Sequence, residues 1–340
     1  VSEEHSKIGA PVQCAGLVSK GGLGALEIDY SGAVLNEIRG ADIYSPSFSC
    51  LSVGNGKQQA FVVDRQKLDS LLAESAVSAG AELEKGKRLG MRDLRGRLIV
   101  GADGASSSVA EWFRFPRIPD YVLCMQADFT GARVEEPHRI AMFVSNGMFP
   151  GLFGWAIPTS NRTVRVGVGI RREKGAGICG LFKEFISGNR IVAEMVSGAK
   201  EQSRLSGIIP VSVRERTAGA NVLLVGDAAG HVKATTGGGI VFGTAAAKAG
   251  AEIIGNGGRP IDYEKGWRKE IGDELALHAR ARRLLDSLSD ESIDSYLALA
   301  KKLGAEEFLN ENGSMDSMKS MLSALERKPV MAWMKMFLST

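Results

Sequence analysis

Short apolar runs predict strands at several places along the chain. Residues 60–63, 98–100 and 222–225 are apolar throughout, which is typical of strands that are buried in a sheet. Between 121 and 170 apolar and polar residues alternate instead, as in the segment from Thr163 to Val168. This second pattern predicts several further strands, each with two different faces.

Helical spacing of apolar residues follows some of these runs. Asp64 is a good N-cap after the run at 60–63, and apolar residues then recur at helical spacing until Gly80. The same reasoning predicts helices over 181–197, over about 240–254, and from about 260 onward. The tail is rich in methionine, which we interpret as core packing of a helical cap: Met315, Met318, Met321, Met331, Met334 and Met336.

The composition is that of an ordinary soluble protein, with 340 residues, 44% hydrophobic, 24% charged and a net charge of +3. It excludes a disordered chain, and the near-neutral charge offers no basic stripe for nucleic acid. Four widely spaced cysteines without a C-x-x-C pair argue against disulfides or a zinc site, so no metal is expected. No apolar run approaches the roughly 18 residues that cross a bilayer, and we expect a cytoplasmic protein.

Glycine is the unusual part of the composition, because 42 residues are glycine and many of them cluster. The strongest cluster follows the run at 222–225, where Asp227 ends a strand and a helix begins near Ile240. An aspartate in this place accepts hydrogen bonds from sugar-like hydroxyls. Bare backbone at a helix start admits a planar ligand and favours negative charge. We therefore interpret the segment as a ligand site rather than a plain strand–helix turn; its glycines are Gly226, Gly230, Gly237, Gly238 and Gly239.

This segment resembles the second FAD motif of the large flavoprotein group that includes aromatic hydroxylases and geranylgeranyl reductases. Residues 98–109, which contain Gly101-Ala102-Asp103-Gly104, are similar to the G-A-D-G-x-x-S-x-V motif of the group. Asp64-Arg65 resembles its strand-to-helix pair, in which the arginine contacts the flavin nucleotide. The resemblance implies an α/β (α+β) fold with an FAD-binding Rossmann-like lobe of the aromatic-hydroxylase type, a β-sheet substrate lobe and a helical C-terminal cap.

The N-terminal stretch is similar to geranylgeranyl reductases in particular, and most of all to the archaeal digeranylgeranylglycerophospholipid reductases. In that family the acidic residue at the position of Glu3 binds the adenosine ribose, and the segment Cys14-Ala15-Gly16 lies beside the flavin. Leu89 is placed near the adenine by its offset. The cofactor-binding residues implied by the resemblance are Glu3, Cys14, Ala15, Gly16, Arg65, Leu89, Asp103, Asp227, Gly237, Gly238, Gly239 and Ile240.

Residues 153–158 resemble the Y-x-W-x-F-P element that lines the isoprenoid pocket of these reductases. Phe153 replaces the tyrosine of that element and Ile157 replaces its phenylalanine, so the wall stays apolar but the phenol is lost. The alternative interpretation is an ordinary strand with a core tryptophan. The implied substrate residues are Phe153, Trp155, Ile157 and Pro158.

The implied reaction saturates C=C bonds of geranylgeranyl chains in archaeal membrane ether phospholipids or their precursors, with hydride from reduced FAD. Cys14 is the first candidate for the proton donor, against the alternative of a small buried thiol. His231 is expected to be a solvent-facing loop residue. The expected partners are the isoprenoid lipid and an electron donor, either a nicotinamide nucleotide or a ferredoxin. Peripheral contact with the inner face of the membrane is also expected.

The resemblance divides the chain into four segments. These are the first part of the FAD lobe (1–115), the substrate sheet (116–215), the return segment of the FAD lobe (216–258) and the helical C-terminal region (259–340). The family begins with a strand and G-x-G-x-x-G before the acidic residue, whereas nothing precedes Val1 here. We therefore expect an N-terminally truncated chain with a weakened hold on FAD.

Other activities of the same group are the alternatives. They are a hydroxylase, a halogenase and a chlorophyll-type geranylgeranyl reductase. Halogenases usually carry W-x-W-x-I-P, and the single Trp155 argues against that activity. A flavin-free, inactive fragment that only binds isoprenoid lipid is a further alternative.

Overall fold

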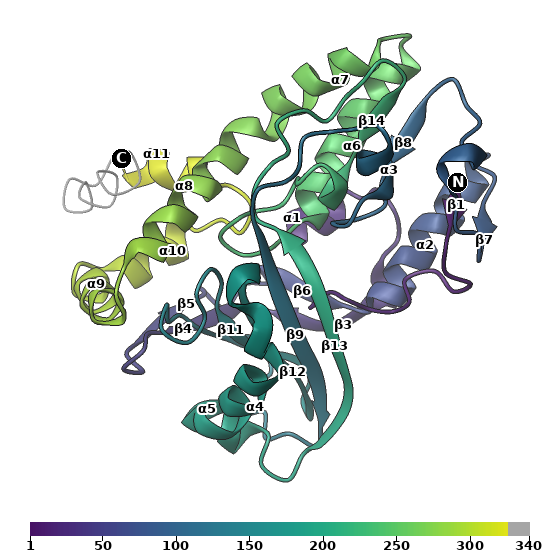
Figure 1. The fold of residues 1–340 in the computed structure, drawn as a ribbon. Coiled ribbons are helices and arrows are strands. Elements are labelled where there is room, and N and C mark those ends of the chain that lie inside the picture. The colour runs from purple at the N-terminus through teal and green to yellow at the C-terminus, as the bar shows by residue number, and fades with distance from the viewer. Residues whose placement is uncertain (326–340) are drawn as a thin grey trace.

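The computed structural model describes residues 1–325, apart from the side chains of residues 175 and 176. The end of the predicted helical region, with Met331, Met334 and Met336, lies outside the described residues. A long twisted sheet occupies the lower part of the molecule, and helices with shorter strands lie above it (Figure 1).

The largest sheet has seven strands in the order β13-β9-β12-β11-β10-β4-β5. Neighbouring strands are antiparallel, except that β4 and β10 run parallel. The strands are β4 (Gly40–Tyr44), β5 (Cys50–Val53), β9 (Tyr121–Thr130), β10 (Arg139–Phe143), β11 (Gly154–Ser160), β12 (Thr163–Arg171) and β13 (Lys200–Pro210). Two of them, β4 and β5, come from the segment predicted as the first part of the FAD lobe. The lobe boundaries themselves stay predictions.

One face of this sheet is covered by α4 (Ile178–Gly188) and α5 (Arg190–Met195). The alternation along β12 explains this burial, because its valines all point to the helices and pack with Phe182 and Phe185. The prediction of one helix over 181–197 is wrong. Asn189 separates two helices, and its side chain caps the second by accepting hydrogen bonds from the backbone N–H groups of Ile191 and Val192.

The remaining strands form three small sheets. Strands β2 (Leu17–Ser19), β6 (Ala60–Val63) and β3 (Val34–Ile38) are antiparallel in the order β2-β6-β3. Two parallel pairs are β1 (Ser2–Glu3) with β7 (Glu84–Lys85), and β8 (Ile99–Gly101) with β14 (Val222–Leu224). The α/β (α+β) class is confirmed, with the parallel strands divided between two separate pairs.

Most helices lie above the large sheet (Figure 1). Helix α2 begins where the sequence predicts, because the Asp64 carboxylate accepts hydrogen bonds from the backbone N–H groups of Gln66 and Lys67. Helices α7 and α8 are joined by the π-helical turn Arg268–Gly272. The helices above the sheet are α1 (Lys20–Gly24), α2 (Arg65–Ser78), α3 (Ser108–Trp112), α6 (Ile240–Gly255), α7 (Pro260–Trp267) and α8 (Asp273–Ser287). The last three described helices, α9 (Asp290–Lys302), α10 (Ala305–Asn312) and α11 (Met318–Leu325), lie toward the β5 end of the sheet. Short 3-10 helices span Ser31–Ala33, Met91–Asp93, Arg172–Gly177 and Gly226–Ala228.

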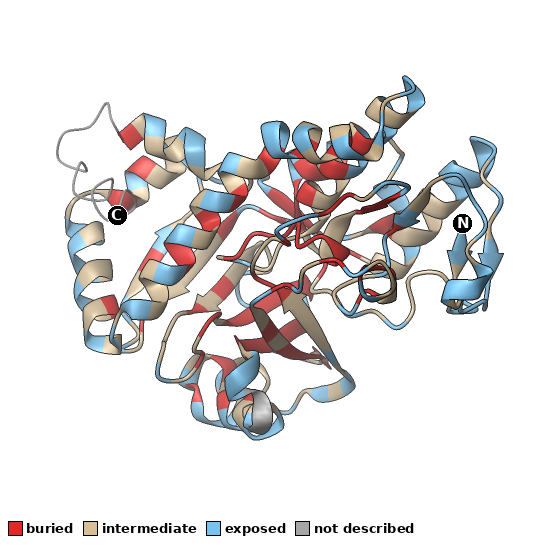
Figure 2. Ribbon diagram, turned by 45° about the horizontal axis from the view of Figure 1, so that its top comes forward, coloured by how far each residue is buried: buried red, intermediate tan, exposed pale blue. Residues whose placement is uncertain are grey.

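Buried residues run through the centre of the molecule, where α6, α7 and α8 meet the strands (Figure 2). The hydroxyl of Tyr263 donates a hydrogen bond to the carbonyl of Leu224 at 2.7 Å, which anchors α7 to β14. The packing of these helices therefore holds the end of β14, where Asp227 follows, in a fixed position.

The C-terminal helices pack against the far edge of the large sheet. A small core joins Leu51 of β5 to Phe308 of α10 and Leu325 of α11. The methionine interpretation is wrong for Met315, which is 40% exposed. No helix among residues 1–325 is long and apolar enough to cross a membrane.

Candidate functional site

Asp227 lies at the carboxyl end of β14, in the 3-10 helix Gly226–Ala228, and faces the start of α6. A Cβ atom added at Gly239 would lie 2.9 Å from Asp227 Oδ1, so a bare backbone is needed at this point. Gly239 is the N-cap of α6 and has no side chain to cap the helix. The glycines 237–239, Ile240 and Asp227 therefore form one cradle with an uncapped helix N-terminus.

The segment Cys14-Ala15-Gly16 directly precedes β2, a strand of the small β2-β6-β3 sheet. Gly16 has φ +75°, and a Cβ there would lie 2.5 Å from the carbonyl of Val63. The Gly16 N–H donates to Cys14 Sγ at 3.3 Å, while its carbonyl accepts from the Val63 N–H at 2.9 Å. Only glycine allows this close approach without strain.

Arg65 connects this segment with Asp227. Its guanidinium forms a two-pronged ion pair with Asp69, with N···O distances of 3.0 to 3.1 Å. Burial alone would lower the pKa of Arg65, but the nearby Cys14 and Asp69 raise it above its usual value. Burial raises the pKa of the Asp227 carboxyl, and Arg65 opposes that rise. Three predicted cofactor residues from distant parts of the chain are thus brought within electrostatic reach of one another.

Three other predicted cofactor residues lie on neighbouring elements. The β8–β14 pairing places Gly101 opposite Leu224, so Asp103 follows β8 at the same edge as Asp227. Its carboxylate accepts hydrogen bonds from the Ser107 hydroxyl and the Val109 N–H, which organises the start of α3. Glu3 and Leu89 belong to the β1–β7 region instead.

Glu3 ends β1, and its carboxylate accepts from the backbone N–H of His5 at 2.8 Å. Its carbonyl accepts from the Lys87 N–H, two residues before Leu89. Both Glu3 and Leu89 are half-buried.

The four predicted substrate residues lie on β11 or directly before it. Trp155 and Ile157 are buried, and they share a core cluster with Ala15 and Leu17. Phe153 contacts Trp155 edge to face, with ring centroids 6.0 Å apart, and Pro158 lies within the buried stretch of the strand, which continues to Thr159. The sheet face that the resemblance assigns to substrate therefore packs directly beneath the Cys14-Ala15-Gly16 segment.

The expectation for His231 is wrong. Its side chain is fully buried, and its ring lies 4.6 Å from that of Trp267. Burial, with a smaller contribution from Arg268, lowers its pKa to about 3, so the imidazole is neutral. His231 is buried because α7 covers its loop in the folded protein, whereas the sequence alone places that loop on the surface.

Two charged residues that the sequence analysis missed hold the site together. Asp128 and Arg165 are opposite each other in the β9–β12 pairing, and the Arg165 side chain donates to both carboxylate oxygens at 2.7 and 2.8 Å. The third contact of Arg165 is a hydrogen bond from Nη1 to the carbonyl of Ala15 at 2.8 Å. Arginine between two buried valines in the segment 164–166 is the sequence signal that would have indicated it.

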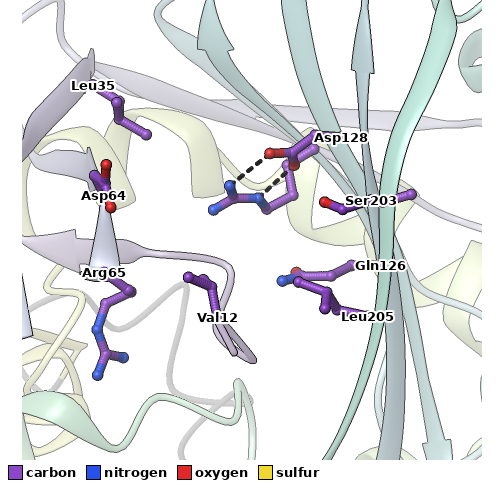
Figure 3. A pocket seen from close by; sticks show the side chains of 10 residues that line it. Val12, Leu35, Asp64, Arg65, Gln126, Asp128, Ser203 and Leu205 are labelled. Atoms are coloured by element: carbon purple, nitrogen blue, oxygen red, sulfur yellow. Dashed lines mark hydrogen bonds and ion pairs between the residues drawn. The ribbon is translucent and has the colours of Figure 1, made fainter. Parts of the chain in front are cut away.

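A cavity of about 260 Å³ lies beside this ion pair (Figure 3). Its walls come from the loop of Val12, the start of α2, and strands β3, β9, β12 and β13. The lining residues are Val12, Leu35, Asp64, Arg65, Gln126, Ala127, Asp128, Arg165, Ser203 and Leu205. Among residues 1–325, no group of three or more His, Cys, Asp or Glu side chains has an arrangement that would hold a metal ion.

Comparison with known structures defines the class of fold. A geranylgeranyl bacteriochlorophyll reductase-like protein from Thermoplasma acidophilum superposes with a TM-score of 0.79 at 22% identity, over 99% of this chain and 92% of that one. A flavin-dependent brominase superposes with a TM-score of 0.72 at 14% identity, over 98% and 92%. The fold is therefore that of the reductases and halogenases of the flavoprotein group.

Comparison with curated sequences defines the family, although no protein-family model matches the chain. A digeranylgeranylglycerophospholipid reductase of Methanosarcina acetivorans is 30% identical over 86% of this chain and 80% of its own length. An uncharacterised protein of Methanocaldococcus jannaschii is 31% identical over 94% of this chain and 87% of its own length. The chain belongs to the digeranylgeranylglycerophospholipid reductase family, and it is an oxidoreductase.

Proposed function

We propose that the protein is an FAD-dependent reductase that saturates C=C bonds of geranylgeranyl chains in membrane ether phospholipids or their precursors. The observation that carries the proposal is a contact between predicted cofactor residues and predicted substrate residues. The Cys14-Ala15-Gly16 segment contacts Arg65 on one side and the buried wall of Trp155 and Ile157 on the other. The substrate follows from the names of the curated relatives.

The residues of the cradle fit a flavin dinucleotide. Asp227 has carboxylate oxygens available for ribityl hydroxyls, and the contact between Asp227 and Gly239 leaves no room for a side chain. The uncapped N-terminus of α6 favours the negative charge of a reduced flavin. Bound FAD, once reduced, supplies the hydride that adds to the double bond.

The residues of the chain itself hold the reacting groups in place, exclude water from them and donate the proton. The Arg165 hydrogen bond to Ala15 holds the segment in place, and the buried apolar wall excludes water from the reacting carbons. We assign the proton donor to Cys14 Sγ, because this thiol is half-buried and lies between Arg65 and the wall. Cys124 lies close beneath it, and burial raises the pKa of that second thiol to about 12, which keeps it protonated.

Two measurements test the function. Titration of the purified chain with FAD is expected to quench flavin fluorescence, and Asp227→Asn is expected to weaken binding at least tenfold. Chemically reduced enzyme under anoxic conditions is expected to add two hydrogens for each double bond of a geranylgeranyl ether lipid, as read by mass spectrometry. If the same reduced enzyme in aerated buffer consumes oxygen only when lipid is added, and forms a hydroxylated product, the reductase assignment is overturned in favour of a hydroxylase.

The proton donor has its own test. Cys14→Ser is expected to retain FAD affinity and KM within about threefold while kcat falls by a factor of about 10² or more, the usual range for loss of a general acid. Cys179→Ser is the matched control, because this thiol is exposed on α4, on the far side of the sheet. An unchanged kcat for Cys14→Ser would remove Cys14 from the mechanism.

The electron donor is tested under anoxic conditions with enzyme whose bound FAD is still oxidised. A nicotinamide nucleotide or a reduced ferredoxin is expected to bleach the flavin absorbance, and the faster of the two is the donor.

A further inference from the structure

The cavity beside the Asp128–Arg165 pair contains a buried polar atom without a partner among the described residues. Gln126 is 5% exposed, and its Oε1 atom accepts no hydrogen bond. Figure 3 shows the Gln126 side chain extending from β9 toward the cavity, across from Val12. An unpaired buried amide oxygen is costly, so a donor that reaches it from the cavity is favoured.

A second unpaired atom lies on the same row of the sheet. Trp155, Gly167 and Gln126 are in register on three neighbouring strands, and they share one face. The Trp155 ring extends over Gly167, with Nε1 2.7 Å from the position of a Cβ there. This indole N–H is buried and also without a partner among the described residues. The row thus holds one unused donor, which lies outside the cavity lining, and one unused acceptor on a lining residue, Gln126, which can accept a hydrogen bond from a hydroxyl group.

The edge of the cavity is opened by an irregularity in β13. Glu201 pairs with Phe129 and Arg204 pairs with Ala127, so the ladder skips Asp128. The bulge exposes Ser203 at the cavity, and such bulges are common beside ligand sites because they redirect side chains.

The charges of the lining select the class of ligand. Both arginines of the lining form ion pairs, Arg65 with Asp69 and Arg165 with Asp128. The charges of the four charged lining residues sum to zero; these residues are Arg65, Arg165, Asp64 and Asp128. No unpaired guanidinium is left to attract a free anion. The remaining groups are the Gln126 oxygen, carboxylate lone pairs and the Ser203 hydroxyl, all of which accept hydrogen bonds from hydroxyls.

We propose that this cavity binds a neutral group with neighbouring hydroxyls, which donates to Gln126 Oε1. The volume of about 260 Å³ suits a fragment of the size of a glycerol or a ribose and lies below that of most drug-sized pockets. Two sources carry this chemistry: the glycerol head of a lipid, and the ribose of a nucleotide. The proposal concerns binding alone and stands independently of the reaction proposed above.

Calorimetric titration with three probes tests the site on the full chain. The probes are 1-O-butylglycerol for the lipid source, methyl β-D-ribofuranoside for the nucleotide source, and 1-O-butyl-2,3-di-O-methylglycerol as a control without hydroxyls. One of the first two probes is expected to bind at least tenfold more tightly than the control. The probe that does so shows whether the natural ligand is the glycerol head of a lipid or the ribose of a nucleotide. Equal affinity for all three probes, or binding of none of them, overturns the proposal and leaves the cavity as a site for ordered water only.

The variants separate a binding role from a structural one. Gln126→Leu is expected to weaken the bound probe at least tenfold, while the urea midpoint of the ligand-free protein stays equal or rises, because an unpaired buried oxygen is removed. Ser203→Ala, on the exposed bulge, is expected to weaken the probe two- to fivefold.

Gln59→Leu is the matched control, since this exposed glutamine donates to Asn55 outside the cavity, and it is expected to change neither quantity. A lower urea midpoint for Gln126→Leu with unchanged probe affinity would assign Gln126 a purely structural role.

Discussion

Replacement of Arg165 by methionine tests whether one side chain holds the Cys14-Ala15-Gly16 segment on the sheet. The guanidinium makes two hydrogen bonds to Asp128 and one to the Ala15 carbonyl. Methionine keeps the apolar stem but removes all three. The Asp128 carboxylate and the Ala15 carbonyl are then left without their donor.

The magnitude follows from burial. Removing one partner of a buried ion pair costs about 3–5 kcal/mol, because the other charge is left without compensation. The Arg165 side chain is 10% exposed and that of Asp128 27%, so water reaches the carboxylate in part. We therefore expect a loss near the low end, about 3 kcal/mol of the free energy of unfolding. The double variant Arg165→Met/Asp128→Leu is expected to recover most of it, because neither charge remains.

Urea denaturation measures the stability, and alkylation of Cys14, followed by mass spectrometry, measures the release of the segment. A hydrogen bond from a charged group contributes about 1.5–3 kcal/mol, so its loss is expected to speed Cys14 alkylation by about tenfold or more. Arg139→Met is the control, since Arg139 and Asp42 form a comparable pair, 24% and 21% exposed, away from this segment. Equal alkylation rates in the two variants, or a double variant no more stable than Arg165→Met, would refute the reasoning.

Three further predictions follow from individual contacts. Gly239→Ala places a Cβ 2.9 Å from Asp227 Oδ1 and is expected to weaken FAD at least tenfold, whereas Gly255→Ala, with no atom within 4 Å, is expected to leave FAD affinity unchanged, as flavin fluorescence will report. The folded-state pKa of His231, about 3, lies below the unfolded value of about 6.5, so its contribution to stability is complete above pH 6.5 and is lost as the pH falls toward 3. His231→Phe, which keeps a ring against Trp267, is expected to reduce the acid slope of the unfolding free energy by about 1.4 kcal/mol per pH unit, and an unchanged slope between pH 6 and 4 would contradict this. The Asp316 carboxylate accepts hydrogen bonds from Ser19 and from the buried Lys233, so Asp316→Ala is expected to speed proteolysis after residue 313 with little change in the urea midpoint. The Glu274 carboxylate also holds this segment, because it accepts hydrogen bonds from the backbone N–H groups of Met318 and Lys319. Equal cleavage rates for Asp316→Ala and the unchanged protein would show that these Glu274 contacts suffice.

The extent of sequence-based prediction differs between the fold and the site. Helix α2 was predictable because its N-cap and its apolar spacing lie within one short segment. The strand, aspartate and glycines between 222 and 240 were predictable for the same reason, since turn geometry at a helix start depends on neighbouring residues. The break at Asn189 was missed because apolar residues continue on both sides of it, although Gly188 is a typical helix stop and Asn189 a favoured N-cap residue.

What the amino-acid sequence determined by itself is therefore local: which segments form strands and helices, where backbone without side chains is required, and which family the motifs resemble. Tertiary structure alone decided that Cys14, Arg65 and Asp227 meet, that Asp128 and Arg165 pair beneath Ala15, and that His231 is buried. These contacts join residues up to about two hundred positions apart. They depend on strand register and helix packing, which are set by burial summed over the whole core and not by the preferences of any single segment.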